Sequence, residues 1–140
     1  MSLDLSHGRL VELQHFLLKE ELGSGMSRVV YVLPFDETKV IKVENSAGMF
    51  QNVKEWEFWL TQKWNTKVSK WLAPCRHISD CGTFLIMDRT EALPKARVPV
   101  KLPRFLTDKK KENFGLLNNK VVCHDYGSVI LDAHIGLKKW

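Results

Sequence analysis

The sequence has few cysteines, no long apolar run and no leader-like N-terminus. Its three cysteines, Cys75, Cys81 and Cys123, cannot all pair within the chain, so we expect free thiols in a reducing compartment. No stretch approaches the ~18 consecutive apolar residues that a membrane span needs. The N-terminal residues lack the cationic and hydrophobic segments of a secretory signal. These absences predict a cytoplasmic protein that does not enter a membrane.

Several signatures of enzymes and metal sites are also missing. No G-x-S-x-G elbow occurs, which argues against a serine hydrolase. Cys75, His77, Cys81, Cys123 and His124 show no C-x₂-C spacing, so buried thiols are favoured over a zinc site. The five tryptophans fall mostly at helical and core positions and form no base-stacking platform. Nucleic acid is therefore not expected as the main ligand.

Charge is unevenly distributed along the chain. The formal net charge is +5, but residues 95–140 carry ten Lys/Arg against four Asp/Glu, a net of +6. Residues 1–94 carry eleven basic and twelve acidic groups, a net of −1. This basic C-terminal third is either a solvated lysine-rich surface or an attachment site for phosphate or an acidic protein partner.

Length and hydrophobic pattern predict one α+β domain over residues 1–140. The composition, 44% hydrophobic and 26% charged, is that of a globular protein able to bury a core. Periodicity predicts a short opening helix, an antiparallel strand pair, a helix, two more strands, a proline-rich connection and a hairpin. Their expected ranges are 9–19, 28–33, 39–44, 51–64, 76–78, 83–87, 90–104, 114–117 and 121–123.

Two glycines stand just before the first predicted strand, in the run Gly23-Ser24-Gly25. Because glycine has no Cβ, such a run lets backbone amides approach a polyphosphate. Ordinary hairpins also use glycine, so both interpretations stay open. A Rossmann dinucleotide motif does not fit, because a strand follows where that motif requires a helix.

A lysine and a glutamate are spaced so that they can meet across two elements. Lys42 lies among apolar strand residues, and Glu55 follows thirteen residues later on the predicted helix. A strand lysine held by a helix glutamate places an ammonium over the α- and β-phosphates of a nucleotide. Glu57 is the competing partner. We favour Glu55, because Phe58 and Trp59 bury its side of the helix.

The basic third carries another set of polar residues. Asp108 and Asn113 form a D-x-x-x-x-N pattern, and Asp125 opens an Asp-Tyr-Gly triplet after a short strand. In phosphoryl transfer, one aspartate accepts the hydroxyl proton, while an asparagine and a second aspartate hold Mg²⁺. The order of these groups along the chain favours ATP and Mg²⁺ as ligands.

With these motifs, residues 22–127 resemble the protein kinase-like fold, in particular the compact kinase-like proteins of bacteria and phages whose metal triplet is Asp-Tyr-Gly. The resemblance implies an antiparallel N-lobe sheet with an αC-like helix over residues 9–89, and a much reduced C-lobe over residues 90–140. It implies site residues in three roles. Gly23, Ser24, Gly25, Lys42 and Met87 would bind ATP, Met87 through the hinge backbone; Asp108, Lys42 and Glu55 would be catalytic; Asn113 and Asp125 would hold Mg²⁺.

The chain also departs from this family. Arg28 stands where a third loop glycine is usual, and residues 105–107 replace the usual His-Arg before Asp108. Eighteen residues separate the expected hinge, 87–89, from Asp108, and thirteen follow Gly127. These lengths leave no room for the helices that dock peptide substrates.

Two functions are therefore consistent with the sequence. The first is an ATP- and Mg²⁺-dependent phosphotransferase that acts on itself or on an unidentified partner, favoured by the presence of Lys42, Glu55, Asp108, Asn113 and Asp125. The second is a weakly active or inactive kinase-fold protein with a binding or inhibitory role, favoured by the missing docking helices. If a phage encodes the protein, the host cytoplasm is its expected location.

Overall fold

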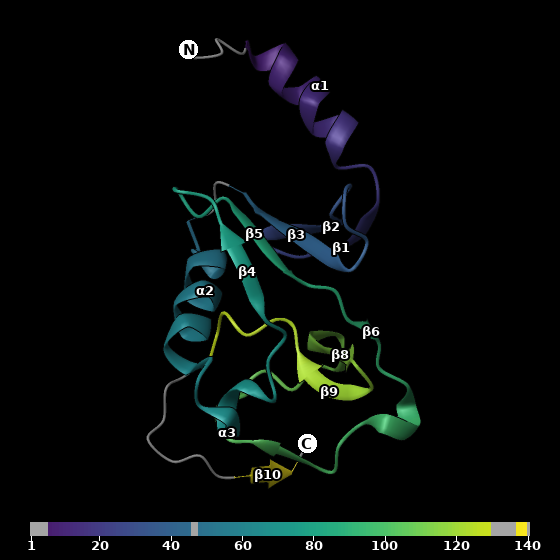
Figure 1. Cartoon of the computed structure of the whole chain (residues 1–140), viewed down its shortest axis with the longest axis vertical. Helices are drawn as coiled ribbons and strands as arrows, with labels where there is room; N and C mark the ends of the chain where they lie inside the picture. The colour runs from purple at the N-terminus through teal and green to yellow at the C-terminus, as the bar shows by residue number, and fades with distance from the viewer. Residues whose placement is uncertain (1–5, 46–47, 130–136, 140) are drawn as a thin grey trace.

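The computed structural model describes residues 6–45, 48–129 and 137–139 (Figure 1). It is a mixed α/β structure with antiparallel sheets and few helices. The helices are α1 (His7–Leu17), α2 (Gln51–Gln62), α3 (Thr66–Ser69) and the 3-10 turns η1 (Lys95–Arg97) and η2 (Lys111–Asn113). The strands are β1 (Glu21–Ser24), β2 (Arg28–Val32), β3 (Lys39–Glu44), β4 (Cys75–Ile78), β5 (Phe84–Asp88), β6 (Glu91–Ala92), β7 (Lys101–Pro103), β8 (Phe114–Leu117), β9 (Lys120–Cys123) and β10 (Leu137–Lys139).

A five-stranded antiparallel sheet, ordered β1-β2-β3-β5-β4, forms the N-terminal half. The alternating run of β3 pairs with β2 on one side and β5 on the other, with Lys42 opposite Val30 and Leu85. Helix α2 lies beside β4 (Figure 1). Strands β2 to β5 and helix α2 agree with the predicted ranges to within two residues, whereas strand β1 was not predicted. A turn over residues 25–27 separates β1 from β2, so the glycines belong to a hairpin of their own.

The second half contains two small sheets. Strands β6, β8 and β9 form one, and β7 pairs with β10 to form the other. The β8–β9 hairpin lies at the predicted place. Asn118 and Asn119 form its turn, with positive φ angles of 50° and 64°, as a type I′ turn requires. The pairing of β10 with β7 was not predicted. Its strands are short and lie far apart in the sequence.

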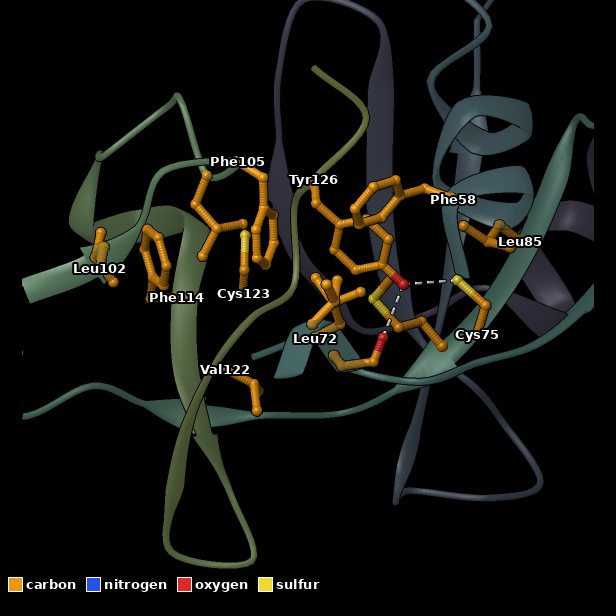
Figure 2. Packing of buried hydrophobic residues seen from close by; sticks show 14 of the residues in the cluster. Phe58, Leu72, Cys75, Leu85, Leu102, Phe105, Phe114, Val122, Cys123 and Tyr126 are labelled. Atoms are coloured by element: carbon orange, nitrogen blue, oxygen red, sulfur yellow. Dashed lines mark hydrogen bonds between the residues drawn. The ribbon is translucent and has the colours of Figure 1, made fainter. Parts of the chain in front are cut away.

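Tyr126 links the buried side chains of the two halves (Figure 2). Its hydroxyl donates to the carbonyl of Ala73 at 2.9 Å and lies 3.1 Å from the Cys75 sulfur. Its ring centroid lies 5.9 Å from that of Phe58 on α2. The core therefore runs without a break from β5, through Leu85, to the β8–β9 hairpin.

Helix α1 projects from the sheet in Figure 1 and buries none of its residues. Ser6 caps it by accepting a hydrogen bond from the amide of Arg9 at 3.4 Å. The helix begins and ends two residues earlier than predicted. No helix in the described part of the chain has the length and apolar character needed to cross a membrane.

Candidate functional site

A cleft of about 1670 Å³ lies between the five-stranded sheet and the C-terminal hairpin segment, residues 108–128, which contains the β8–β9 hairpin. Most of the residues expected to act together line it. They are Gly23, Ser24, Gly25, Lys42, Asp108, Asn113 and Asp125. Glu55 and Met87 do not line the cleft. Groups more than 80 residues apart in the sequence thus share one site.

Lys42 forms the floor of the cleft. The alternation of β3 buries Val40 and Lys42 together, and Lys42 is 3% exposed. Its ammonium donates to Glu55 Oε1 at 2.9 Å and to the backbone carbonyl of His124. An ammonium has three N–H donors, so one remains for a ligand. Glu57 lies on the exposed side of α2 and takes no part in this pairing.

Glu55 is fully buried and connects three parts of the chain. Oε1 accepts hydrogen bonds from Lys42 and Arg28, and Oε2 accepts one from the backbone amide of Tyr126 at 2.7 Å. Burial alone would raise the pKa of this carboxyl. The charges of Lys42 and Arg28 outweigh it and lower the pKa to about 2. Glu55 therefore stays ionised at neutral pH.

Arg28 enters the site from the start of β2, which sequence reasoning did not foresee. The sequence marked it only as a substitute for a third glycine. In the structure it is 8% exposed, and it donates to Asn52 Oδ1 at 3.1 Å, to Glu55 Oε1, and to Asp125 Oδ1 at 2.9 Å. Burial opposes its charge, but Glu55 and Asp125 raise the pKa of the guanidinium above its usual value. Arg28 thus joins the sheet, α2 and the Asp-Tyr-Gly triplet.

Asn52 is a second residue that sequence reasoning missed. Its side-chain nitrogen donates to the carbonyls of Lys42, Gly82 and Thr83 at 2.9–3.0 Å. It lies three positions before Glu55 and so shares its helix face. The sequence signal that could have identified Asn52 is its position as a polar residue on the buried face of the predicted helix. Asn52 holds α2 against the sheet and so fixes the position of Glu55.

The glycine hairpin offers fewer amides than the sequence implied. The N–H of Gly25 donates to the carbonyl of Arg28 at 2.8 Å and closes the β1–β2 turn. A Cβ added at Gly23 or Gly25 would meet no atom within 4 Å. Packing within the chain therefore does not require glycine at either position. The open space above the hairpin remains available to a ligand.

Asp108 and Asn113 lie at the opposite wall of the cleft. The side-chain amide of Asn113 donates to the carbonyl of Asp108 at 3.4 Å, and the amide of Lys110 lies 3.4 Å from Asp108 Oδ1. Asn113 is buried, and its carbonyl accepts from the His124 amide at 2.8 Å. These contacts connect the Asp108 loop to the strand that carries Asp125.

His124 supports this wall. Its Nε2 donates to the carbonyl of Glu112 at 2.6 Å, which leaves Nδ1 to accept from the Thr90 hydroxyl at 2.7 Å. Burial, followed by the charge of Lys42, lowers the pKa of His124. The neutral His124 ring, bonded to Glu112 and Thr90, therefore fixes the position of the His124 backbone carbonyl, to which Lys42 donates.

The side chain of Met87 lies in the core rather than in the cleft, and its expected contact with adenine through the backbone stays a prediction. Met87 is fully buried near the C-terminal end of β5, between Val40 on β3 and Cys75 on β4. Alternation along the strand places it on the same core-facing side as Leu85. The segment 88–92, which follows it, lines the cleft instead.

One of the two expected Mg²⁺ ligands is engaged by another side chain of the protein, and the metal role of Asn113 and Asp125 stays a prediction. Asp125 Oδ1 accepts from Arg28, and the charges of Arg28 and Lys42 are balanced by those of Glu55 and Asp125. Among the described residues, no three His, Cys, Asp or Glu side chains are grouped to hold a metal ion. Arg28 thus places a positive charge directly beside Asp125.

Comparisons with known proteins found little similarity. No protein-family model matches the sequence, and no curated protein matches it. Among solved structures, the chain is similar to one in the ternary complex of streptomycin, ATP and APH(2")-IIa, with a TM-score of 0.43 and 20% identity. The match covers 65% of this chain and 30% of that one. A similarity with this TM-score shows neither the fold nor the function of the chain.

Proposed function

We propose that the protein is a minimal kinase-like phosphotransferase that binds ATP in the cleft and transfers the terminal phosphate slowly, to itself or to a partner. The observation that carries this proposal is the buried ammonium of Lys42, held by Glu55 and the His124 carbonyl at the cleft floor. Burying an amine is costly unless it is paired and hydrogen-bonded. A buried, positioned lysine that still faces an open cleft is suited to an anionic ligand.

ATP would lie with its phosphates between Lys42 and the glycine hairpin. The open space above Gly23 and Gly25 leaves room for them, and the cleft volume of about 1670 Å³ exceeds the range typical of small-ligand sites. The adenine would lie against segment 88–92, which lines the cleft beside β3. Ser24, at the end of β1, would contact the phosphates from the hairpin.

Asp108 would act as the proton acceptor. The acceptor hydroxyl oxygen attacks the γ-phosphorus, its proton passes to the Asp108 carboxylate, and the bond between the γ-phosphorus and the ADP oxygen breaks. Lys42 and Arg28 would offset the charge on the phosphates, and Asn113 would hold the Asp108 loop. A positioned proton acceptor contributes about 10²–10⁴ in rate, so the residual transfer without it should be slight.

The test is label transfer from γ-labelled ATP to the purified protein and to a cell extract. We expect slow, Asp108-dependent incorporation, reduced at least about 100-fold in Asp108→Asn. Asp80→Asn is the matched control, because Asp80 is exposed in the β4–β5 turn and does not line the cleft. Equal labelling of wild type and Asp108→Asn, or labelling of neither, would contradict catalysis by this site.

A nucleotide-responsive binding module is the second candidate. The contact of Arg28 with Asp125 favours it, since that contact engages one of the two expected metal ligands. Lys109, Lys110 and Lys111 are exposed next to the cleft and would attract an acidic or phosphate-bearing partner. Nucleotide binding without label transfer would favour this function.

A further inference from the structure

We propose that Arg28 takes the place of a divalent cation beside Asp125, so that the cleft binds ATP without Mg²⁺. The inference rests on the proposed function and deepens it: the positive charge that a metal ion would bring to this site comes instead from a side chain of the protein. Arg28 lines the cleft although it is almost completely buried.

The position of Arg28 follows from the β1–β2 hairpin. The N–H of Gly25 bonds to the Arg28 carbonyl and sets the end of the turn. Arg28 is the first residue of β2, opposite Glu44 on β3. Its side chain then extends beneath the hairpin toward α2. A glycine at this position, as the kinase-like pattern has, could make none of these contacts.

The contacts of Arg28 come from three separate parts of the chain. They are Asn52 Oδ1 and Glu55 Oε1 on α2, and Asp125 Oδ1 just after β9. The guanidinium has five N–H donors, and these three contacts leave two for other acceptors. Arginine binds phosphate through such paired donors. Arg28 can thus keep its place against Glu55 and contribute to a phosphate site.

The charges at this position disfavour a second cation. Arg28 lies 2.9 Å from Asp125 Oδ1, and a divalent ion on that oxygen would place like charges side by side. Displacing Arg28 instead would take a buried guanidinium from one of its two carboxylates, which is costly. With Arg28 in place, Asp125 is already neutralised. The phosphates of a nucleotide would then meet Arg28 and Lys42 directly.

The experiment is calorimetric titration of ATP, once with EDTA and once with Mg²⁺, into wild type, Arg28→Gln and Arg28→Lys. We expect the wild-type affinity to change less than about 3-fold between the two conditions. Arg28→Gln should bind about 10-fold more weakly in EDTA, as the loss of one charge-assisted contact predicts. It should recover affinity with Mg²⁺, because Asp125 is then free to hold the ion. Arg28→Lys should retain part of the binding in EDTA.

The matched control is Arg97→Gln, since Arg97 is exposed and bonds only to Asn119 in the described part of the chain. A wild type that binds ATP only with Mg²⁺ would overturn this inference and leave the proposed function intact. Unchanged binding of a folded Arg28→Gln in EDTA would overturn it as well. Wild type that binds ATP in neither condition overturns both proposals. If Arg28→Gln does not fold, the wild-type comparison alone decides.

Discussion

Lys42 and Arg28 place two buried positive charges at the base of an open cleft, and Glu55 neutralises only one of them. The second is balanced by Asp125, whose side chain is about half exposed. The two cations differ in their freedom to bind a ligand. Lys42 is confined by β3 and the His124 carbonyl, whereas Arg28 spans α2 and the segment after β9. At the residue scale, the site is a neutral four-charge cluster with spare donors toward the cleft.

Replacement of Lys42 by alanine should weaken nucleotide binding. Losing a charge-assisted contact costs about 1.5–3 kcal/mol, or about 10- to 100-fold in affinity. Titration of ATP into Lys42→Ala measures this directly. Lys54→Ala is the control, because Lys54 is exposed on α2. ATP binding of wild-type strength in Lys42→Ala would place the phosphates somewhere else.

Hydrogen bonds hold helix α2 against the sheet on one side and against the Asp-Tyr-Gly triplet on the other. Asn52 ties it to β3 and to the β4–β5 turn, and Glu55 ties it to the Asp-Tyr-Gly triplet. The turn itself approaches the helix closely at Gly82. Gly127 comes equally close to the start of α2, where a Cβ would lie 2.1 Å from Gln51 Oε1. At the element scale, two glycines allow the neighbouring segments to reach α2.

Gly82→Ala should destabilise the fold. Gly82 has φ +75°, and a Cβ would lie 2.5 Å from a Val53 methyl on α2. The left-handed conformation alone costs a non-glycine residue about 1–2 kcal/mol, and the clash adds to it. Urea unfolding of Gly82→Ala should show a lower midpoint. Gly8→Ala, on the exposed α1 where a Cβ meets nothing within 4 Å, should be neutral or slightly stabilising. If the urea midpoints of Gly82→Ala and Gly8→Ala changed by the same amount, the turn at Gly82 would not be constrained.

The hydrophobic core and the ionic cluster of Lys42, Arg28, Glu55 and Asp125 both connect the five-stranded sheet with the segment that follows β9. The ring and hydroxyl of Tyr126 lie in the core (Figure 2). Its backbone N–H donates a hydrogen bond to Glu55 Oε2 in the ionic cluster. Protonation of Glu55 would therefore loosen α2, the sheet and the C-terminal hairpin segment at once. At the scale of the whole molecule, this carboxylate couples the two halves.

The free energy of unfolding should fall in acid. The pKa of Glu55 is lowered from 4.5 to about 2 on folding, so its contribution is complete above pH about 4.5 and is lost as the pH falls through about 2. Glu55→Gln should lower stability at neutral pH by about 3–5 kcal/mol, because it leaves the buried ammonium of Lys42 without a carboxylate and takes from Arg28 one of its two. Its pH dependence between pH 5 and about 2.5 should be flatter than that of the wild type. Urea unfolding across this range measures both effects.

Glu57→Gln is the matched control, since Glu57 lies on the exposed side of the same helix. It should keep both the wild-type stability and the wild-type acid response. An acid transition of equal steepness in wild type and a folded Glu55→Gln would assign that response to other carboxylates.

The sequence alone determined the elements whose signals are local. Alternation predicted β3, helical periodicity predicted α2, and two adjacent asparagines predicted the β8–β9 turn. The local patterns placed Lys42 on a strand and Glu55 on a helix but left the direction of Lys42 and the choice between Glu55 and Glu57 open; the structure shows the contact of Lys42 with Glu55. Their roles toward ATP stay predictions.

Only the tertiary structure decided which distant groups meet. Arg28 contacts Asp125 across 97 residues, and no spacing rule reports on a partner so far away. Strand alternation does not say which face of β5 meets the core, so only the structure shows that the Met87 side chain is buried. The pairing of β7 with β10 depends on the packing of the surrounding chain rather than on the few residues of either strand. Such contacts arise when the hairpin segment packs against the sheet, and the energy that selects them is spread over the entire core.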